Sequence, residues 1–308
     1  MRPTDIVVPS LRVVRATVEP VATTDLRPGK QYLAGTSTTR LRSGGAGIVN
    51  WLASEKRATG GTIGAAYVET FGARVDALRQ SQAVQVANLG VVGGIPLVAL
   101  HFGCVDKRNP PKLRVLITAG VHGDEPAGPA AAMLFAQQLL LQPKLRDGVE
   151  FTIVPLINPT GLSAGTRVNV DLKDLNRWFS TAANAPLEVR LVRDVLARGY
   201  NLALDLHGAA VNNGGFFGLH LDAGAVLERS LALLARRYPI MDDRPACYDK
   251  QGPGIYVSRN PGTLKDFVVE TGSDSAITVE APHCLTHEDQ VRGTAELVRY
   301  LVGVSLTR

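Results

Sequence analysis

The sequence contains few of the residues on which several classes of protein depend. Cysteine occurs only three times in 308 residues, and no Cys-x-x-Cys pair is present. This scarcity argues against a disulfide framework or a cysteine zinc site, and it favours a reducing compartment. No apolar run approaches the roughly 20 residues of a membrane-spanning helix, and no apolar segment typical of a signal peptide follows the first residues. We therefore expect a cytoplasmic protein that does not associate with a membrane.

Aromatic residues and clustered charges are scarce as well. Aromatics make up 6% of the sequence, and the net charge of +5 comes from lysines and arginines that form no run longer than two. A nucleic-acid-binding surface usually has a basic patch or stripe, so we expect no nucleic acid partner. The mild positive charge is more consistent with an anionic small-molecule substrate.

What the sequence does contain is a regular alternation of strand and helix patterns. Strands are predicted over 83–91, 95–101, 113–118, 150–156, 202–206 and 277–280, and helices over 66–78, 126–142, 187–198, 223–237, 264–270 and 289–302. Strands separated by helices predict an α/β protein, here a three-layer α/β/α sandwich with a mixed, mostly parallel sheet. Residues 66–308 would form this single domain. Residues 1–65 would be an N-terminal extension of unclear structure.

The first candidate site is the segment His122-Gly-Asp-Glu125, which lies where a predicted strand ends and a predicted helix begins. In open α/β sheets, ligands bind at the carboxyl ends of the strands. His122 and Glu125 could both face one metal ion, and both side chains suit Zn²⁺. The same segment also fits a helix N-terminus, with Asp124 as N-cap and Glu125 favoured by the helix dipole. On its own, the segment leaves both interpretations open.

A second histidine, His207, follows another predicted strand. Two histidines and one glutamate make three ligands, and they leave a fourth position for a water molecule, as a catalytic zinc requires. His207 therefore favours the metal interpretation. Asp205 could orient a histidine through a hydrogen bond, or it could be an ordinary turn residue.

The connection 158–179 is unusually long for one without regular structure. Connections of about 20 residues are usually functional or disordered. Arg167 and Arg177 bring planar guanidinium groups that can match a carboxylate or stabilise an oxyanion. The apolar residues Leu175 and Phe179 argue against a freely flexible loop, because such a loop has no use for apolar anchors.

Five short stretches occur in an order that resembles the zinc carboxypeptidase superfamily. They are His122-Gly-Asp-Glu125, Asn158-Pro-Thr-Gly with Gly165-Thr-Arg167, Asp174-Leu-Asn176-Arg177, Asp205-Leu-His207 and Thr278-Val-Glu280. The resemblance covers about residues 70–308. The compact spacing looks closest to small bacterial members such as the murein peptide amidases, and the succinylglutamate desuccinylase/aspartoacylase branch is the near cousin.

The resemblance implies a role for each matching residue. The ligands of one zinc ion per chain would be His122, Glu125 and His207. Glu280 would be the general base, and Arg167 would polarise the scissile carbonyl. Glu280 also ends a short predicted strand, although a glutamate in such a position is more often simply solvated.

The residues that would contact the substrate match less closely. Asn176 and Arg177 would hold a substrate carboxylate, but Trp178 stands where the superfamily usually has Asn. Thr160 stands where Asp is common. Tyr256 is the nearest candidate for the mobile tyrosine of the superfamily. These departures concern the identity of the substrate more than the metal.

The expected function is that of a zinc-dependent metallopeptidase of the carboxypeptidase or peptide amidase type. It would hydrolyse an amide bond next to a free carboxylate, in a small peptide or an acyl amino acid, by a zinc-activated water. The alternative is an N-acyl amino acid deacylase of the succinylglutamate desuccinylase/aspartoacylase type. The arrangement Gly165-Thr-Arg167-Val-Asn169 favours the peptidase. A non-catalytic binding protein on this fold would have lost a ligand or the base, whereas the sequence has the full set.

Overall fold

The computed structural model describes residues 63–307, apart from 106–109, 182–183, 209–213 and 244–247. Most of the predicted N-terminal extension, residues 1–62, lies outside the described residues. The described strands are β1 (Gln85–Val92), β2 (Ile95–Phe102), β3 (Leu113–Ala119), β4 (Val149–Val154), β5 (Leu202–Gly208), β6 (Phe217–Leu221), β7 (Asp249–Gly252), β8 (Ile255–Val257) and β9 (Ala276–Ala281). The described helices are α2 (Ile63–Arg79), α3 (Ala127–Leu141), α4 (Pro159–Ala164), α5 (Leu187–Leu196), α6 (Gly224–Leu234), α7 (Leu264–Glu270) and α8 (His287–Leu306), with 3₁₀ turns η1 (Pro143–Arg146) and η2 (Leu175–Arg177).

Within the described residues, nine strands form one mixed sheet in the order β1-β2-β4-β3-β5-β9-β6-β8-β7. The central strands β4, β3, β5 and β9 are parallel to their neighbours in that group. Antiparallel pairs extend the sheet on both sides, β1 and β2 beside β4 and β6 beside β9. The carboxyl ends of β3, β5 and β9 therefore meet at one edge, where the candidate residues were expected.

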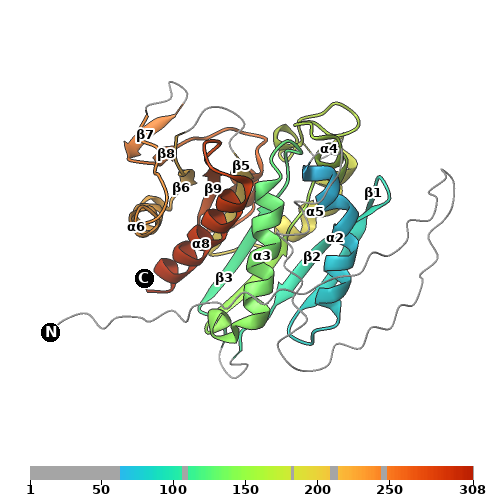
Figure 1. Cartoon of the computed structure of the whole chain (residues 1–308), viewed down its shortest axis with the longest axis horizontal. Helices are drawn as coiled ribbons and strands as arrows, with labels where there is room; N and C mark the ends of the chain where they lie inside the picture. Colours follow the sequence, from blue (N-terminus) through green and yellow to red (C-terminus); the bar gives the residue numbers. More distant parts are fainter. Residues whose placement is uncertain (1–62, 106–109, 182–183, 209–213, 244–247, 308) are drawn as a thin grey trace. The chain divides into compact units, whose positions relative to one another are not determined.

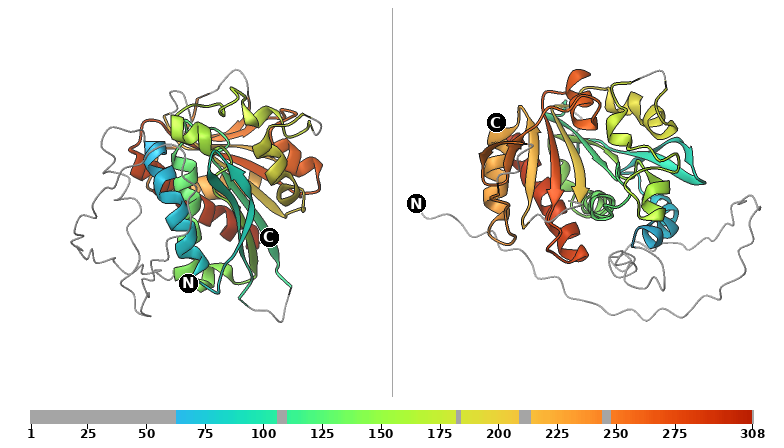
Figure 2. Two further views of the ribbon diagram at one scale, coloured as in Figure 1. Left: turned by 90° about the vertical axis from the view of Figure 1, so that its right-hand side faces the viewer. Right: turned by 90° about the horizontal axis from the view of Figure 1, so that it is seen from above.

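Helices cover both faces of the sheet, which confirms the predicted three-layer α/β/α sandwich. Figure 1 shows α2, α3, α8 and α6 in a row in front of the sheet, and Figure 2 shows α5 and α7 on the other side. The front row shares one large apolar cluster with the sheet, and α5 and α7 share a second one. None of the described helices is long and apolar enough to cross a membrane.

The alternation of side chains along β5 decides which face carries the polar residues. Leu204 and Leu206 belong to the cluster under α3 and α8, whereas Ala203 belongs to the cluster under α5 and α7. Because successive side chains of a strand point to opposite faces, Asp205 and His207 lie on the α5/α7 face. The two polar side chains of β5 thus lie on the same side of the sheet.

Two parts of the chain contain more regular structure than the sequence analysis predicted. The connection 158–179 contains the short helix α4 and the turn η2, and the Gly/Pro-rich segment 242–264 contains β7 and β8. Strand β6 was not predicted either. β7, with the sequence Asp-Lys-Gln-Gly, has no apolar alternation, and it is a strand because β8 pairs with it. The other predicted strands and helices are present, with ends that differ by a few residues.

Candidate metal centre

His122 lies at the end of β3, in a turn that only glycine permits. Gly120 has a positive φ of 67°, and such a conformation is strained for other residues. A Cβ on Gly123 would lie 1.9 Å from the carbonyl carbon of Gly161. The two backbones therefore touch, and this contact fixes the turn that carries His122 against α4.

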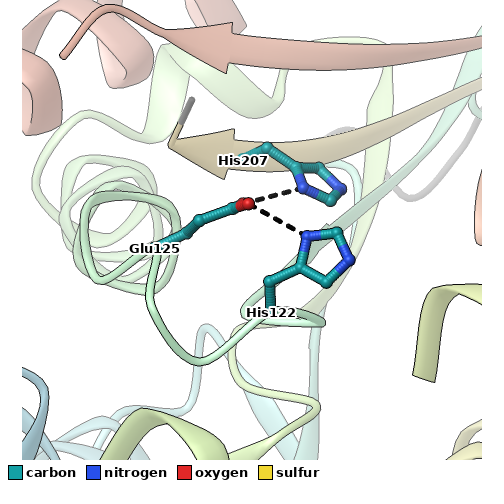
Figure 3. A group of neighbouring side chains, drawn as sticks. All are labelled: His122, Glu125 and His207. Carbon is teal, nitrogen blue, oxygen red and sulfur yellow. Dashed lines mark hydrogen bonds and ion pairs between the residues drawn. The ribbon is translucent and has the colours of Figure 1, made fainter. Parts of the chain in front are cut away.

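Glu125 joins the two histidines. Its Oε1 lies 3.0 Å from Nδ1 of His122, and its Oε2 lies 2.8 Å from Nδ1 of His207. Figure 3 shows the carboxylate between the two rings. The backbone N–H of Gly208 donates to the same Oε2 at 3.1 Å. All three side chains are buried, and one ligand atom from each lies within 4.8 Å of the others.

This geometry bears on the two interpretations of the His122 segment. Helix α3 begins at Ala127, and its N-cap Pro126 provides no side-chain hydrogen bond. The carboxylate of Glu125 is directed at the histidines and does not cap the helix. A cluster of two imidazoles and one carboxylate is a donor set that fits Zn²⁺. The three residues can therefore hold a metal ion.

The Nε2 atom of each histidine ring, which points away from Glu125, faces a second carboxylate. Nε2 of His207 lies 2.8 Å from Oδ2 of Asp205, and Nε2 of His122 lies 3.1 Å from Oδ1 of Asp174. Thr118 donates to the other oxygen of Asp205 at 2.8 Å. Such partners fix the orientation of histidines that bind metals. Asp205 was expected either to orient a histidine or to be an ordinary turn residue, and in the structure it forms a hydrogen bond with His207.

Asp174 is the residue that the sequence analysis missed. It lies in the motif Asp174-Leu-Asn176-Arg177, but nothing in its spacing ties it to His122, which is 52 positions away. A local signal did exist, since its side chain caps η2 by accepting the backbone N–H of Asn176 at 3.0 Å. That signal predicts a turn and gives no reason to expect a histidine beside it.

Arg167 lies at the rim of the cluster. Its Nε lies 3.2 Å from Oδ2 of Asp174, and its NH1 lies 3.6 Å from Oε1 of Glu125. Its side chain is 39% exposed, whereas those of the three candidate ligands are buried. The guanidinium can therefore face both the cluster and a molecule that arrives from solvent.

Glu280 reaches the same place from β9. It pairs in register with His207 on β5, and paired residues of parallel strands point to the same face. Burial raises the pKa of Glu280 to about 7, with the positive charge of His207 acting against this and the negative charge of Glu125 adding to it. A carboxyl group poised near neutral pH suits general acid–base work.

The electrostatics of the candidate ligands reflect their mutual contacts. Burial alone would raise the pKa of Glu125, but the charge and hydrogen bonds of His207 and His122 lower it to about 2. Burial alone would lower the pKa of His207, but Asp205 and Glu125 raise it well above its ordinary value. The pKa of His122 is also raised, because Asp174 and Glu125 outweigh its burial.

Asn176 and Arg177 lie beside the centre but face different surroundings. Asn176 is buried, and its Oδ1 accepts the backbone N–H of Leu264 at the start of α7 at 2.8 Å. Arg177 is exposed, and its NH1 donates to the carbonyl of Asn176 at 2.7 Å. A Cβ on Gly262 would lie 2.8 Å from the carbonyl oxygen of Arg177, so the two segments are in close contact. The amide oxygen of Asn176 is thus engaged, whereas Arg177 is exposed to solvent.

Tyr256 is held in a separate apolar cluster with Phe217, Leu219 and Met241. Its ring is fully buried, and its hydroxyl donates to the carbonyl of Asp243 at 2.6 Å. In this arrangement the hydroxyl is not directed at the candidate ligands. Its expected contact with substrate remains a prediction that requires the side chain to move.

Fold and site together define a metal-dependent hydrolase of the carboxypeptidase-like fold. The family model of the succinylglutamate desuccinylase/aspartoacylase catalytic domain matches residues 111–298, which is more than half of the chain. The chain belongs to this family, and it is an enzyme. The resemblance to the zinc carboxypeptidase superfamily is confirmed, and the matching family is the branch that the sequence analysis placed second.

Known proteins with similar sequences or structures are carboxypeptidase-like. Mouse (Mus musculus) carboxypeptidase D is 25% identical over 209 residues, which cover 58% of this chain and 15% of that much longer protein. A provisionally assigned metallopeptidase from Shewanella denitrificans OS217 has a TM-score of 0.65 at 22% identity, over 77% of this chain and 89% of that one. The metallo-carboxypeptidase of Pseudomonas aeruginosa has a TM-score of 0.60 at 21% identity, over 78% and 69% of the two chains. At these identities the solved structures support the fold alone.

Proposed function

We propose that the protein is a zinc-dependent hydrolase of an amide bond that lies next to a free carboxylate. One observation carries the proposal: Glu125 joins His122 and His207 in a buried cluster, with Glu280 and Arg167 at its side. One zinc ion per chain, held by the three ligands, would act as a Lewis acid and lower the pKa of a water molecule toward about 7.

The chain's own residues would move the protons and orient the substrate. Glu280 accepts a proton from the attacking water and passes it to the nitrogen of the leaving amine, so that the carbon–nitrogen bond breaks without releasing a free amide anion. Arg167 donates hydrogen bonds to the carbonyl oxygen as negative charge develops on it. Asp174 and Asp205 keep the two histidine rings in place.

Arg177 supplies the recognition of a substrate carboxylate. Its guanidinium is exposed beside the centre and matches a carboxylate through two parallel hydrogen bonds. The guanidinium of Arg177 donates to the backbone carbonyl of Asn176. Asn176 is itself held in place, because its amide oxygen accepts the backbone N–H of Leu264. The solved structure of the Pseudomonas metallo-carboxypeptidase contains (2-guanidinoethylmercapto)succinic acid, which also carries carboxylates. That likeness supports an anionic group on the substrate of this chain.

Two substrate classes share this chemistry. A small peptide with a free C-terminus is the first, and it agrees with the carboxypeptidase D likeness. An N-acyl amino acid is the second, and the family match to succinylglutamate desuccinylase and aspartoacylase favours it. In both, the scissile amide lies beside a carboxylate that Arg177 can hold. We further propose that nucleic acid is not a partner, and salt-dependent retention on a polyanion column would contradict this.

The experiment that tests the function combines metal analysis with a substrate screen. Purified protein should contain about one zinc per chain, and His207→Ala should lose most of it. The screen compares peptides with free C-termini, cell-wall tripeptides and N-acyl amino acids, each beside its carboxyl-amidated form. Zinc bound as tightly by His207→Ala as by the parent would show that the ligands are wrong. Zinc without hydrolysis of any substrate class would contradict the reaction.

A further inference from the structure

The segment between Arg167 and Asp174 is built around one buried side chain, Asn169. Its Oδ1 accepts the backbone N–H groups of Asp171 and Lys173 at 3.1 and 3.0 Å. Its own backbone N–H donates to the carbonyl of Lys173 at 3.1 Å. Asn169 thus closes the turn and brings the two ends of the segment together. At those ends, Arg167 and Asp174 are joined by a 3.2 Å ion pair.

The remaining group of Asn169 reaches a different element of the fold. Its Nδ2 lies 3.1 and 3.3 Å from the two carboxylate oxygens of Glu188, in the first turn of α5. Both side chains are only 2% exposed. A carboxylate in the first turn of a helix is stabilised by the helix dipole, and the amide of Asn169 supplies it with a hydrogen-bond donor. The contact therefore anchors the segment to the α5 layer.

Apolar packing does not hold the tip of this segment. Val170 is 71% exposed and Leu172 is 82% exposed. Leu172 also has a positive φ of 58°, a strained conformation for a residue with a side chain. Thr160 accepts the backbone N–H of Val170 at 3.2 Å, but this contact is exposed to solvent. A strained turn with solvated apolar side chains depends on its buried polar anchor.

We propose that Asn169 and Glu188 are positioning residues for the metal centre. Their contact holds the turn so that Asp174 meets Nε2 of His122 and Arg167 faces Glu125. Within the part of the chain that the structure describes, neither Asn169 nor Glu188 forms a hydrogen bond with a candidate ligand, so each acts through the turn. The proposal rests on the proposed function for its effect on turnover, but its effect on metal binding and on the turn is independent of any substrate.

The proposal can be tested by exchanging the donor and the acceptor of the hydrogen bond between Asn169 and Glu188. Asn169→Asp keeps an oxygen for the two backbone N–H groups but places a second carboxylate against Glu188, where two buried like charges repel each other. Adding Glu188→Gln restores a donor–acceptor pair in the opposite direction. The control is Asn201→Asp, because Asn201 also accepts a backbone N–H, from Arg114, and donates to a carboxylate, that of Asp274. That pair lies at the other end of β5.

The variants are compared by zinc affinity, by hydrogen exchange of residues 166–174 and by kcat and KM. Asn169→Asp should weaken zinc binding by about 10–100-fold, the usual effect of losing a partner behind a metal ligand. It should also expose the amides of the turn and lower kcat more than it raises KM. The double variant should recover all three properties to within about threefold of the parent, and the control should change none.

Two outcomes would overturn the proposal. One is an Asn169→Asp variant with the parent's zinc affinity and hydrogen exchange. The other is a defect that Glu188→Gln does not relieve. If Asn169→Asp does not fold, Glu188→Leu removes the carboxylate that anchors Asn169 and fills its buried site with an apolar side chain. Parent-like zinc affinity in that variant would contradict the proposal. If the parent hydrolyses none of the substrates, the proposed function fails, while zinc affinity and hydrogen exchange still decide the role of the anchor.

Discussion

Glu280 on β9 lies directly opposite His207 on β5, and each is the residue before the last one of its strand. This register places a carboxyl group beside a candidate ligand without any loop having to position it. Strands fix side chains more precisely than loops do. Glu280 and the candidate ligand His207 are therefore held by two neighbouring strands at the same edge of the sheet.

Replacing Glu280 by Gln should separate catalysis from metal binding. The amide keeps the size and the hydrogen-bonding carbonyl of the side chain but cannot accept a proton from water. We expect kcat to fall by about 10²–10⁴-fold, the usual contribution of general base catalysis, with zinc content unchanged. Kinetics and metal analysis of Glu280→Gln and of the exposed control Glu69→Gln check this. A loss of zinc would mean that Glu280 is a ligand and not the base.

The raised pKa of Glu280 predicts how the stability of the metal-free protein depends on pH. Burial raises this pKa from an ordinary value of 4.5 to about 7, so between these values the folded state binds its proton more tightly than the unfolded state. The free energy of unfolding should therefore fall as pH rises through this window. With chelator present, Tm of the parent relative to Glu280→Gln should decrease from pH 5 to 7. If the difference in Tm between the two proteins stays constant over this range, the pKa of the Glu280 carboxyl group is not raised.

The carboxylates behind the histidines should tune zinc affinity. Asp174→Asn and Asp205→Asn each keep a similar shape but remove the negative charge that faces Nε2 of a histidine. Each should weaken zinc binding by about 10–100-fold. Competition with a chelator measures this, and the exposed Asp76→Asn serves as control. If Asp174→Asn binds zinc like the parent, Asp174 does not act on the metal through His122.

Arg177 should matter only for substrates with a free carboxylate. Arg177→Lys keeps the charge but loses the planar fork. It should lower kcat/KM for such substrates, and amidation of the carboxylate should therefore harm the parent far more than the variant. Arg190→Lys, an exposed arginine on α5, is the matched control. Equal losses on amidation in both enzymes would rule Arg177 out as the carboxylate site and would favour an internal-bond hydrolase.

The predicted N-terminal extension also yields a prediction. Every residue of the candidate centre lies beyond residue 120, and α2 already begins at Ile63. Deletion of residues 1–60 should therefore leave zinc content and solubility unchanged. An insoluble or metal-free truncated protein would show that this segment contributes to the catalytic domain.

The sequence was most informative where a candidate residue follows a regular element. His122, His207 and Glu280 each lie at or just beyond the end of a buried parallel strand, and such ends converge in space whatever the connections between them. Their proximity could therefore be predicted. The partner of His122, Asp174, could not, because its position depends on the turn that Asn169 closes, and turn geometry has no periodic signal.

The edge of the sheet beyond β9 was the other part that the sequence did not reveal. β6 is a short buried strand of five residues, Phe217–Leu221. Its apolar residues alternate with Gly218 and His220, a pattern that continues too briefly to stand out. β7 and β8 are shorter still, and each is stabilised mainly by its neighbour in the sheet. Tertiary pairing outweighs local propensity in strands of this length.

The contacts of Glu125, Asp174 and Asp205 with the two histidines should make metal binding at this centre depend on pH. These carboxylates raise the pKa of His122 and of His207, so protons should compete with a zinc ion for both rings more strongly than for ordinary histidines. The apparent zinc affinity should therefore weaken as the pH falls, and competition with a chelator at several pH values measures this. The carboxylates that orient the two rings for a metal ion thus also favour their protonated form, which cannot bind it.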